Sequence, residues 1–181
     1  MRKFIGFCAA VMMLAACNGN GSKGEQAPTD SVTVTIPDST VYGLCTEGTS
    51  MNCVELTTNG NDTLRYIIYS DSIMSPVKGG MMTGDKLAVT AHMEGDDWVA
   101  DRVINLTTLL GKWSSIDKNF EIQEGGSVKA VVTENNKYVS WEICNGRLVL
   151  APDTFDIYEL GADSLMLENN EGIFVYARIS K

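Results

Sequence analysis

Apolar and polar residues alternate with a period of two along much of this chain. Five such stretches follow one another in the first half, at residues 42–44, 54–56, 64–68, 87–93 and 98–104. A further alternation at residues 32–36 ends at Pro37, which cannot donate to a central strand. Residues 59–62 (Asn-Gly-Asn-Asp) predict a hairpin, because Asn-Gly accepts the positive φ of a type I′ turn. Five strands with no helix between them predict a small all-β barrel or sandwich.

A second pattern begins after residue 104. Asn105 is expected to cap a single helical turn over residues 106–110, which Gly111 ends. Turn-forming residues then recur at Gly125-Gly126, Asn135-Asn136, Asn145-Gly146, Ala151-Pro152-Asp153, Gly161-Ala162 and Asn169-Asn170. This spacing predicts an up-and-down β-barrel. The chain therefore divides into two predicted β domains, at residues 32–106 and 107–181.

The first 31 residues have a different character. A positive start at Arg2 and Lys3 precedes an apolar run over residues 4–16, which predicts a secretory signal peptide at residues 1–16. The run is shorter than the roughly 20 apolar residues that a membrane-spanning helix needs, although an ordinary signal peptide stays an alternative. Residues 17–31 are rich in Gly and polar residues, as expected for a flexible tether.

The residues Leu14-Ala15-Ala16-Cys17 resemble the lipobox of bacterial lipoproteins. The resemblance implies a diacylglyceryl group on the Cys17 thiol, with palmitate among its acyl chains, and cleavage before this residue. Anchoring to the outer membrane follows from it. Surface-bound lipoproteins of Bacteroidetes often carry an acidic cluster after the cysteine, but here only Glu25 is near. Both the periplasmic face and the cell surface therefore remain open.

Charge limits the expected partners. Without Arg2 and Lys3, the remaining 12 basic residues face 23 acidic ones, a balance of −11. An acidic chain is a poor ligand for nucleic acid or anionic lipid, so we expect no nucleic-acid partner and membrane attachment through the lipid alone.

Three cysteines remain once Cys8 leaves with the signal peptide and Cys17 is acylated: Cys45, Cys53 and Cys144. If the chain turns about Thr49, Cys45 and Cys53 fall opposite each other and could form a disulfide bond. The alternative is that no cysteine pairs. The chain contains no Cys-x-x-Cys, so neither a redox centre nor a zinc knuckle is indicated.

Both predicted domains resemble modules of envelope lipoproteins. Residues 38–106, with their five strands, the turn at 48–52 and the segment 82–89, are similar to OB-like modules. Gly111-Lys112-Trp113 after a helical turn, with Arg178 on the last strand, resembles the short lipocalin-like domains of Bacteroidetes lipoproteins. That resemblance implies that Arg178 packs over Trp113 and closes one end of the barrel. The alternative is that Trp113 is a core residue of another antiparallel fold. Strands this short do not imply a ligand cavity of the usual size.

A triplet of Asp, then Ser or Thr, then an aliphatic residue or Thr occurs five times. It resembles the O-glycosylation acceptor of Bacteroidetes envelope proteins, which implies glycans on Ser31, Ser39, Thr63, Ser72 and Ser164. The alternative is turn chemistry, because Asp-Ser and Asp-Thr commonly precede strands.

No residue set indicates a reaction. His92 is the only histidine and has no nucleophile placed by a motif, and the stretch Gly79–Gly84 leads into a predicted strand rather than the helix that a phosphate loop needs. We therefore expect no enzyme, no cofactor and no metal. The function expected is a non-enzymatic envelope lipoprotein that binds a small apolar molecule, a glycan or a protein. A structural or stress-sensing partner of envelope assembly is the alternative, and a hydrolase a remote one.

Overall fold

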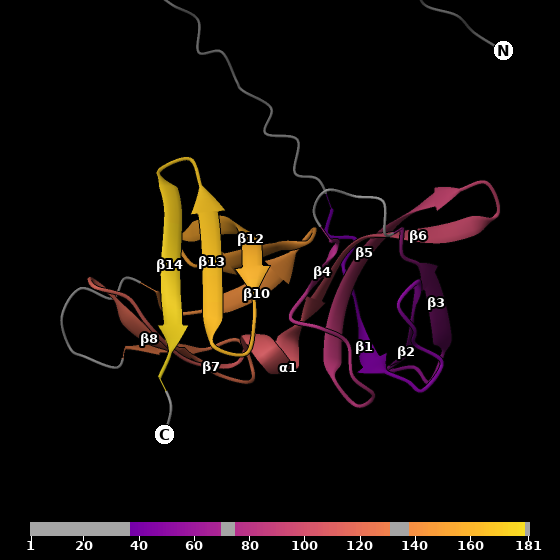
Figure 1. Cartoon of the computed structure of the whole chain (residues 1–181), viewed down its shortest axis with the longest axis horizontal. Helices are drawn as coiled ribbons and strands as arrows, with labels where there is room; N and C mark the ends of the chain where they lie inside the picture. Colours follow the sequence, from indigo (N-terminus) through magenta and orange to yellow (C-terminus); the bar gives the residue numbers. More distant parts are fainter. Residues whose placement is uncertain (1–36, 70–74, 131–137, 180–181) are drawn as a thin grey trace, which may run out of the picture. The chain divides into compact units, whose positions relative to one another are not determined.

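The computed structural model describes residues 37–69, 75–130 and 138–179 (Figure 1). The predicted signal peptide, the tether with Cys17, the alternation at residues 32–36, the turn at Asn135-Asn136 and the motif residues Ser31 and Ser72 lie outside this part. All described residues belong to one unit of the chain, Ile36–Lys181.

The first half forms a closed five-stranded barrel. β1 (Val41–Cys45), β2 (Cys53–Thr58) and β3 (Thr63–Ile67) form an antiparallel meander, β5 (Lys86–Glu94) returns to pair with β1, and β6 (Asp97–Asn105) pairs with β5. A parallel pairing of Ile67 with Val99 joins β3 to β6 and closes the barrel. The return of a strand to lie beside the first is a Greek key, so the predicted OB-like barrel is confirmed. The short strand β4 (Val77–Lys78), which the sequence did not predict, pairs with the same edge of β6 as β3 does, opposite β5.

Alternation along the strands builds the core of this barrel. Side chains that share the inner face are almost completely buried, among them Val54, Leu56, Leu87, Val89 and Val103. Ala88, between Leu87 and Val89, and Ile104, next to Val103, point the other way and belong to the core of the second sheet. β5 and β6 therefore contribute both faces to hydrophobic cores.

The hairpin between β2 and β3 lies where the sequence predicts it, but its turn type differs. Asn61 has a φ of 63°, and Thr58 N donates to Asp62 O at 2.9 Å. The loop is therefore a three-residue turn that ends in a left-handed residue, and the predicted type I′ turn at Asn59-Gly60 is wrong.

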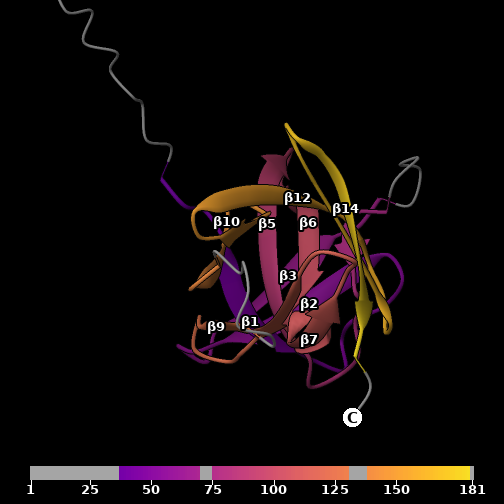
Figure 2. The same cartoon turned by 90° about the vertical axis from the view of Figure 1, so that its left-hand side faces the viewer.

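The predicted helical turn is present as α1 (Leu106–Leu109), where the Asn105 side chain accepts a hydrogen bond from Thr108 N at 2.9 Å. An eight-stranded antiparallel sheet follows in the strand order β10-β11-β12-β13-β14-β7-β8-β9. Its strands are β7 (Gly111–Ser114), β8 (Asn119–Ile122), β9 (Val128–Ala130), β10 (Trp141–Cys144), β11 (Arg147–Leu150), β12 (Asp153–Leu160), β13 (Ser164–Asn169) and β14 (Gly172–Arg178). A bridge between Ser127 and Ser140 links the two outermost strands, so the sheet is nearly closed, as an up-and-down barrel requires (Figure 2).

Aromatic side chains fill this second barrel. Trp113, Phe120, Phe155 and Tyr176 are each at most 2% exposed. The rings of Phe120 and Tyr176 meet edge to face with centroids 5.0 Å apart, and Phe120 and Tyr138 do so at 5.6 Å. The interior is therefore a packed core.

The expected opposition of Cys45 and Cys53 is wrong. Cys45 lies opposite Leu56 and Cys53 lies opposite Ile67, and both thiols are free. The cause is the connection between the two strands, in which Ser50 and Cys53 form their own tight turn instead of a single turn centred on Thr49. The Cys45 thiol instead donates to Thr49 Oγ1 at 3.2 Å.

Candidate functional site

The mouth of the first barrel contains an apolar cup of about 330 Å³. Its lining combines aliphatic and aromatic side chains with two polar ones: Ser39, Val41, Leu64, Arg65, Tyr66, Ala91 and Trp98. These residues come from the start of β1, from β3 and from the two strands of the β5–β6 hairpin. The volume is in the range of small-molecule sites, which favour the mouths of β-barrels.

Two aromatic rings shape this cup. Tyr66 is 5% exposed, whereas Trp98 is 50% exposed although it is a large apolar side chain. Their centroids lie 6.5 Å apart with an interplanar angle of 71°. Ala91 lines the space beside them, and its small side chain leaves room that a larger residue would fill.

Arg65 borders the cup, but its side chain points to the other face of β3. Its Nε donates to Cys53 Sγ at 2.8 Å, which orients the guanidinium. Within the described residues the terminal nitrogens of Arg65 form no other hydrogen bond. Cys53 pairs with Ile67, on the face of β3 opposite Leu64 and Tyr66, so the guanidinium lies on the outer face of the barrel. The cup itself is lined mainly by apolar side chains.

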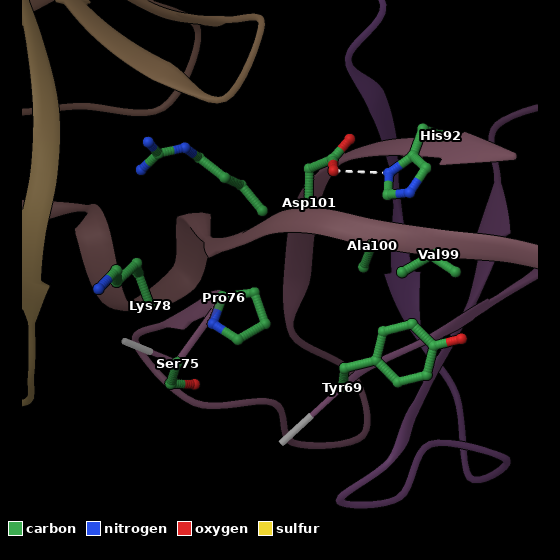
Figure 3. Close-up of a pocket in the computed structure, with 9 residues that line it drawn as sticks. Tyr69, Ser75, Pro76, Lys78, His92, Val99, Ala100 and Asp101 are labelled. Atoms are coloured by element: carbon green, nitrogen blue, oxygen red, sulfur yellow. Dashed lines mark hydrogen bonds and ion pairs between the residues drawn. The ribbon is translucent and has the colours of Figure 1, made fainter. Parts of the chain in front are cut away.

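A second, polar groove of about 360 Å³ lies on the outer side of the same hairpin (Figure 3). His92 on β5 and Asp101 on β6 point toward each other there, with 2.7 Å between Nδ1 and Oδ1. Tyr69, Ser75 and Lys78 also line the groove.

A β-bulge places Asp101. Thr90 pairs with Arg102 and Ala91 pairs with Ala100, so Asp101 is an extra residue without a partner on β5. Bulges redirect side chains and are frequent beside functional sites. Here the bulge places the carboxylate against the imidazole, which is about half exposed.

The other polar groups of this groove already have partners. Lys78 Nζ donates to Tyr158 O at 2.8 Å, and Arg102 pairs with Asp156 at 3.3 Å. Burial, together with the neighbouring Arg102, lowers the pKa of Lys78. Ser75 Oγ accepts from Val77 N at 3.2 Å. The groove thus holds an imidazole with an orienting carboxylate, and no nucleophile is hydrogen-bonded to that imidazole among the residues described.

Trp113 and Arg178, which the sequence singled out, do meet. They are register partners on β7 and β14, and the guanidinium carbon lies 4.2 Å from the indole centroid. Arg178 also donates to Leu110 O at 2.9 Å and, through its other nitrogens, to the carbonyl oxygens of Thr108 and Ala162. Burial lowers the pKa of this guanidinium. The pair closes one end of the filled barrel.

The residues of the predicted glycosylation triplets that the structure describes, Ser39, Thr63 and Ser164, lie apart from one another. Ser39 borders the apolar cup and bonds Asn145 Oδ1 through both its amide, at 2.9 Å, and its hydroxyl, at 3.1 Å. Thr63 is exposed at the start of β3, and Ser164 Oγ donates to Glu159 at 2.7 Å. Cys144 is a free, partly exposed thiol on β10.

Sequence reasoning missed both the cup and Asp101. A signal for the cup was available, since Trp98 follows the Gly95 turn at an inward position of its strand, but the sequence does not show that this indole stays half exposed. The bulge that places Asp101 leaves no mark in the alternation.

Comparison with protein-family models, with curated proteins and with solved structures finds no match for this chain. Across the described ranges, no cluster of three or more His, Cys, Asp or Glu side chains could hold a metal ion. No helix within the described part has the length and apolar character needed to cross a membrane.

Proposed function

We propose that this chain is an acylated envelope lipoprotein whose folded part is a non-enzymatic binding module, with its ligand site at the mouth of the first barrel. The ligand is a small, largely apolar molecule. One observation carries the proposal: Trp98 remains half exposed beside the buried Tyr66 in a cup of about 330 Å³ with mainly apolar walls.

Burial of Trp98 supplies the driving force. Covering apolar surface contributes about 25 cal/mol per Å², and an indole presents one of the largest apolar surfaces of any side chain. The second barrel is the less favourable place for a ligand, because Trp113, Phe120 and Phe155 already fill it.

The anchor is the sequence-based part of the proposal. Acylation of Cys17 would hold the protein at the outer membrane, and residues 17–31 would separate the folded part from the lipid. This accords with the charge balance of −11, which opposes direct binding to anionic headgroups.

We assign His92 and Asp101 a structural role. The two residues connect β5 to β6 next to the bulge through an exposed hydrogen bond between side chains.

Titration with 1-anilinonaphthalene-8-sulfonate tests the site, because this probe presents apolar rings to an apolar cup. We expect one equivalent to bind to the full mature chain, with Trp98→Ala abolishing binding. Ile173→Ser, which removes exposed apolar surface from the second barrel, is the matched control and should leave binding unchanged. Equal binding by the wild type and Trp98→Ala would overturn the proposal.

A further inference from the structure

Strand β14 is longer than the strand beside it. β14 spans seven residues, but β7 pairs only with Ala177 and Arg178. In Figures 1 and 2, β7 lies near the C-terminal end of β14, and the β13–β14 hairpin extends beyond it. Residues 172–176 of β14 are paired with β13 alone.

The hydrogen bonds show which groups this leaves open. Arg178 N donates to Asp163 O at 2.9 Å on the β13 side, and Ile179 N donates to Lys112 O at 2.9 Å on the β7 side. Because backbone groups of a strand alternate in direction, the N–H and C=O of Val175 and Ile173 face the β7 side. In the described part of the chain these four groups have no partner.

The β7–β8 turn leaves this position vacant. The register that pairs Ser114 with Ala177 would place residue 116 opposite Val175, but Ser115 N donates to Lys118 O at 2.8 Å and turns the chain away. A groove of about 300 Å³ remains between the turn and β14.

Apolar side chains border the groove on the outer face of the sheet. Val175 is 58% exposed, Ile173 is 54% exposed, and Ile116 at the tip of the turn is fully exposed. Natural edge strands usually carry Lys, Pro or a bulge that prevents pairing with another strand. This edge instead presents β-branched aliphatic residues, which favour pairing with another strand.

Lys118 supplies a charge at the inner side of the groove. Its ammonium lies 3.3 Å from Tyr138 Oη, and 5.2 Å and 5.5 Å from the ring centroids of Tyr138 and Phe174. No carboxylate of the described residues pairs with it. Asp117, the neighbouring residue in the turn, also lines the groove.

We propose that this edge binds an extended segment of a partner protein that adds a strand to β14, with the pattern apolar–acidic–apolar. Two of its residues bond Val175 and Ile173 and direct apolar side chains to the outer face, because directly paired residues share a face. The residue between them, opposite Phe174, points inward, where its carboxylate meets the Lys118 ammonium. Open backbone donors and acceptors select an extended strand over a lipid or a packed helix.

This site is on the second barrel and is independent of the ligand proposed for the cup. The probe is a fluorescent, end-blocked Thr-Val-Glu-Val-Thr peptide, with Thr-Val-Lys-Val-Thr as its charge-reversed control. On the full mature chain, anisotropy should show about tenfold tighter binding of the acidic peptide, the ratio expected for one charge-assisted contact. Lys118→Glu should reverse this preference, whereas Trp98→Ala should leave it unchanged.

Amide hydrogen exchange tests the backbone contacts. The acidic peptide should slow exchange at Val175 and Ile173, and Val175→Pro, which removes one donor at a strand edge, should abolish binding while Val175→Thr retains it. A peptide N-methylated at its bonding amides should fail to bind, which keeps the test valid if Val175→Pro does not fold. Equal affinity for both peptides, or unchanged exchange at Val175 and Ile173, would overturn the proposal. So would dimerisation of the chain through this edge, because the partner would then be a second copy.

Discussion

Replacing Arg178 by Met removes the closure of the second barrel while keeping a long apolar side chain. Arg178 Cζ lies 4.2 Å from the Trp113 centroid, and the guanidinium bonds three carbonyl oxygens, of Thr108, Leu110 and Ala162. It therefore joins the end of α1 to the β12–β13 turn across the indole.

The magnitude follows from these contacts. A partly exposed cation–π contact contributes about 1 kcal/mol. The carbonyls of Thr108 and Leu110 lose a charged donor, at about 1–2 kcal/mol in total, since water replaces part of it. We expect Arg178→Met to lower the free energy of unfolding by about 2–3 kcal/mol. Arg178→Lys keeps the charge but loses the fork of donors, so its loss should be about half as large.

Urea unfolding followed by tryptophan fluorescence and by circular dichroism measures both changes. Arg147→Met is the matched control, because Arg147 pairs with Asp156 at the surface at 3.2 Å and contacts no indole. A loss below about 0.5 kcal/mol for Arg178→Met, equal to that of the control, would show that the cation does not stabilise the barrel end.

Three further predictions concern ionisation, thiols and a turn. Burial raises the pKa of Tyr138 and of Tyr176 above their ordinary value of 10.0. The folded state therefore favours the protonated phenols, so their contribution to the free energy of unfolding is complete below about pH 10 and is lost above it. Absorbance at 295 nm should show both tyrosines ionising only as the protein unfolds. Ionisation of the two phenols near pH 10 in the folded protein would refute this. Reductant should leave the midpoint of thermal unfolding unchanged, and titration of the unfolded, unreduced protein should find the thiols of Cys45, Cys53 and Cys144 all free. A lower midpoint in reductant would reveal a disulfide. Gly146→Ala should cost about 1–2 kcal/mol in a melting experiment, because Gly146 has a φ of 73° and an added Cβ would lie 2.8 Å from Arg102 Cδ; a neutral result would show that the turn adapts.

Alternation and turn residues were sufficient to predict both barrels, since each buried strand requires one apolar face and each hairpin its own turn chemistry. Asn145-Gly146 shows this well: both residues adopt the positive φ that the pair predicts. Alternation failed where pairing begins or ends. Val139 continues the apolar face of Trp141 and Ile143 in the sequence, yet it is 70% exposed, because β10 starts only at Trp141.

Register was the other limit. The expected bond between Cys45 and Cys53 assumed a turn centred on Thr49. The tighter turn between Ser50 and Cys53 shifts the pairing of β1 with β2, so the two cysteines no longer lie opposite each other. Asp101 reaches His92 only through a bulge. Trp113 and Arg178 were accessible because the resemblance to lipocalin-like domains implies an arginine of the last strand over the tryptophan, and a cation over an indole is a physically sound way to close a barrel end.

Native mass spectrometry of the protein purified from its own envelope tests the central claim most directly. We expect a Cys17 mass that includes the diacylglyceryl group, together with one small bound molecule that Trp98→Ala loses and Ile173→Ser retains. An unmodified Cys17, or a bound molecule that survives Trp98→Ala, would contradict the account of an anchored module with its ligand at the first barrel's mouth.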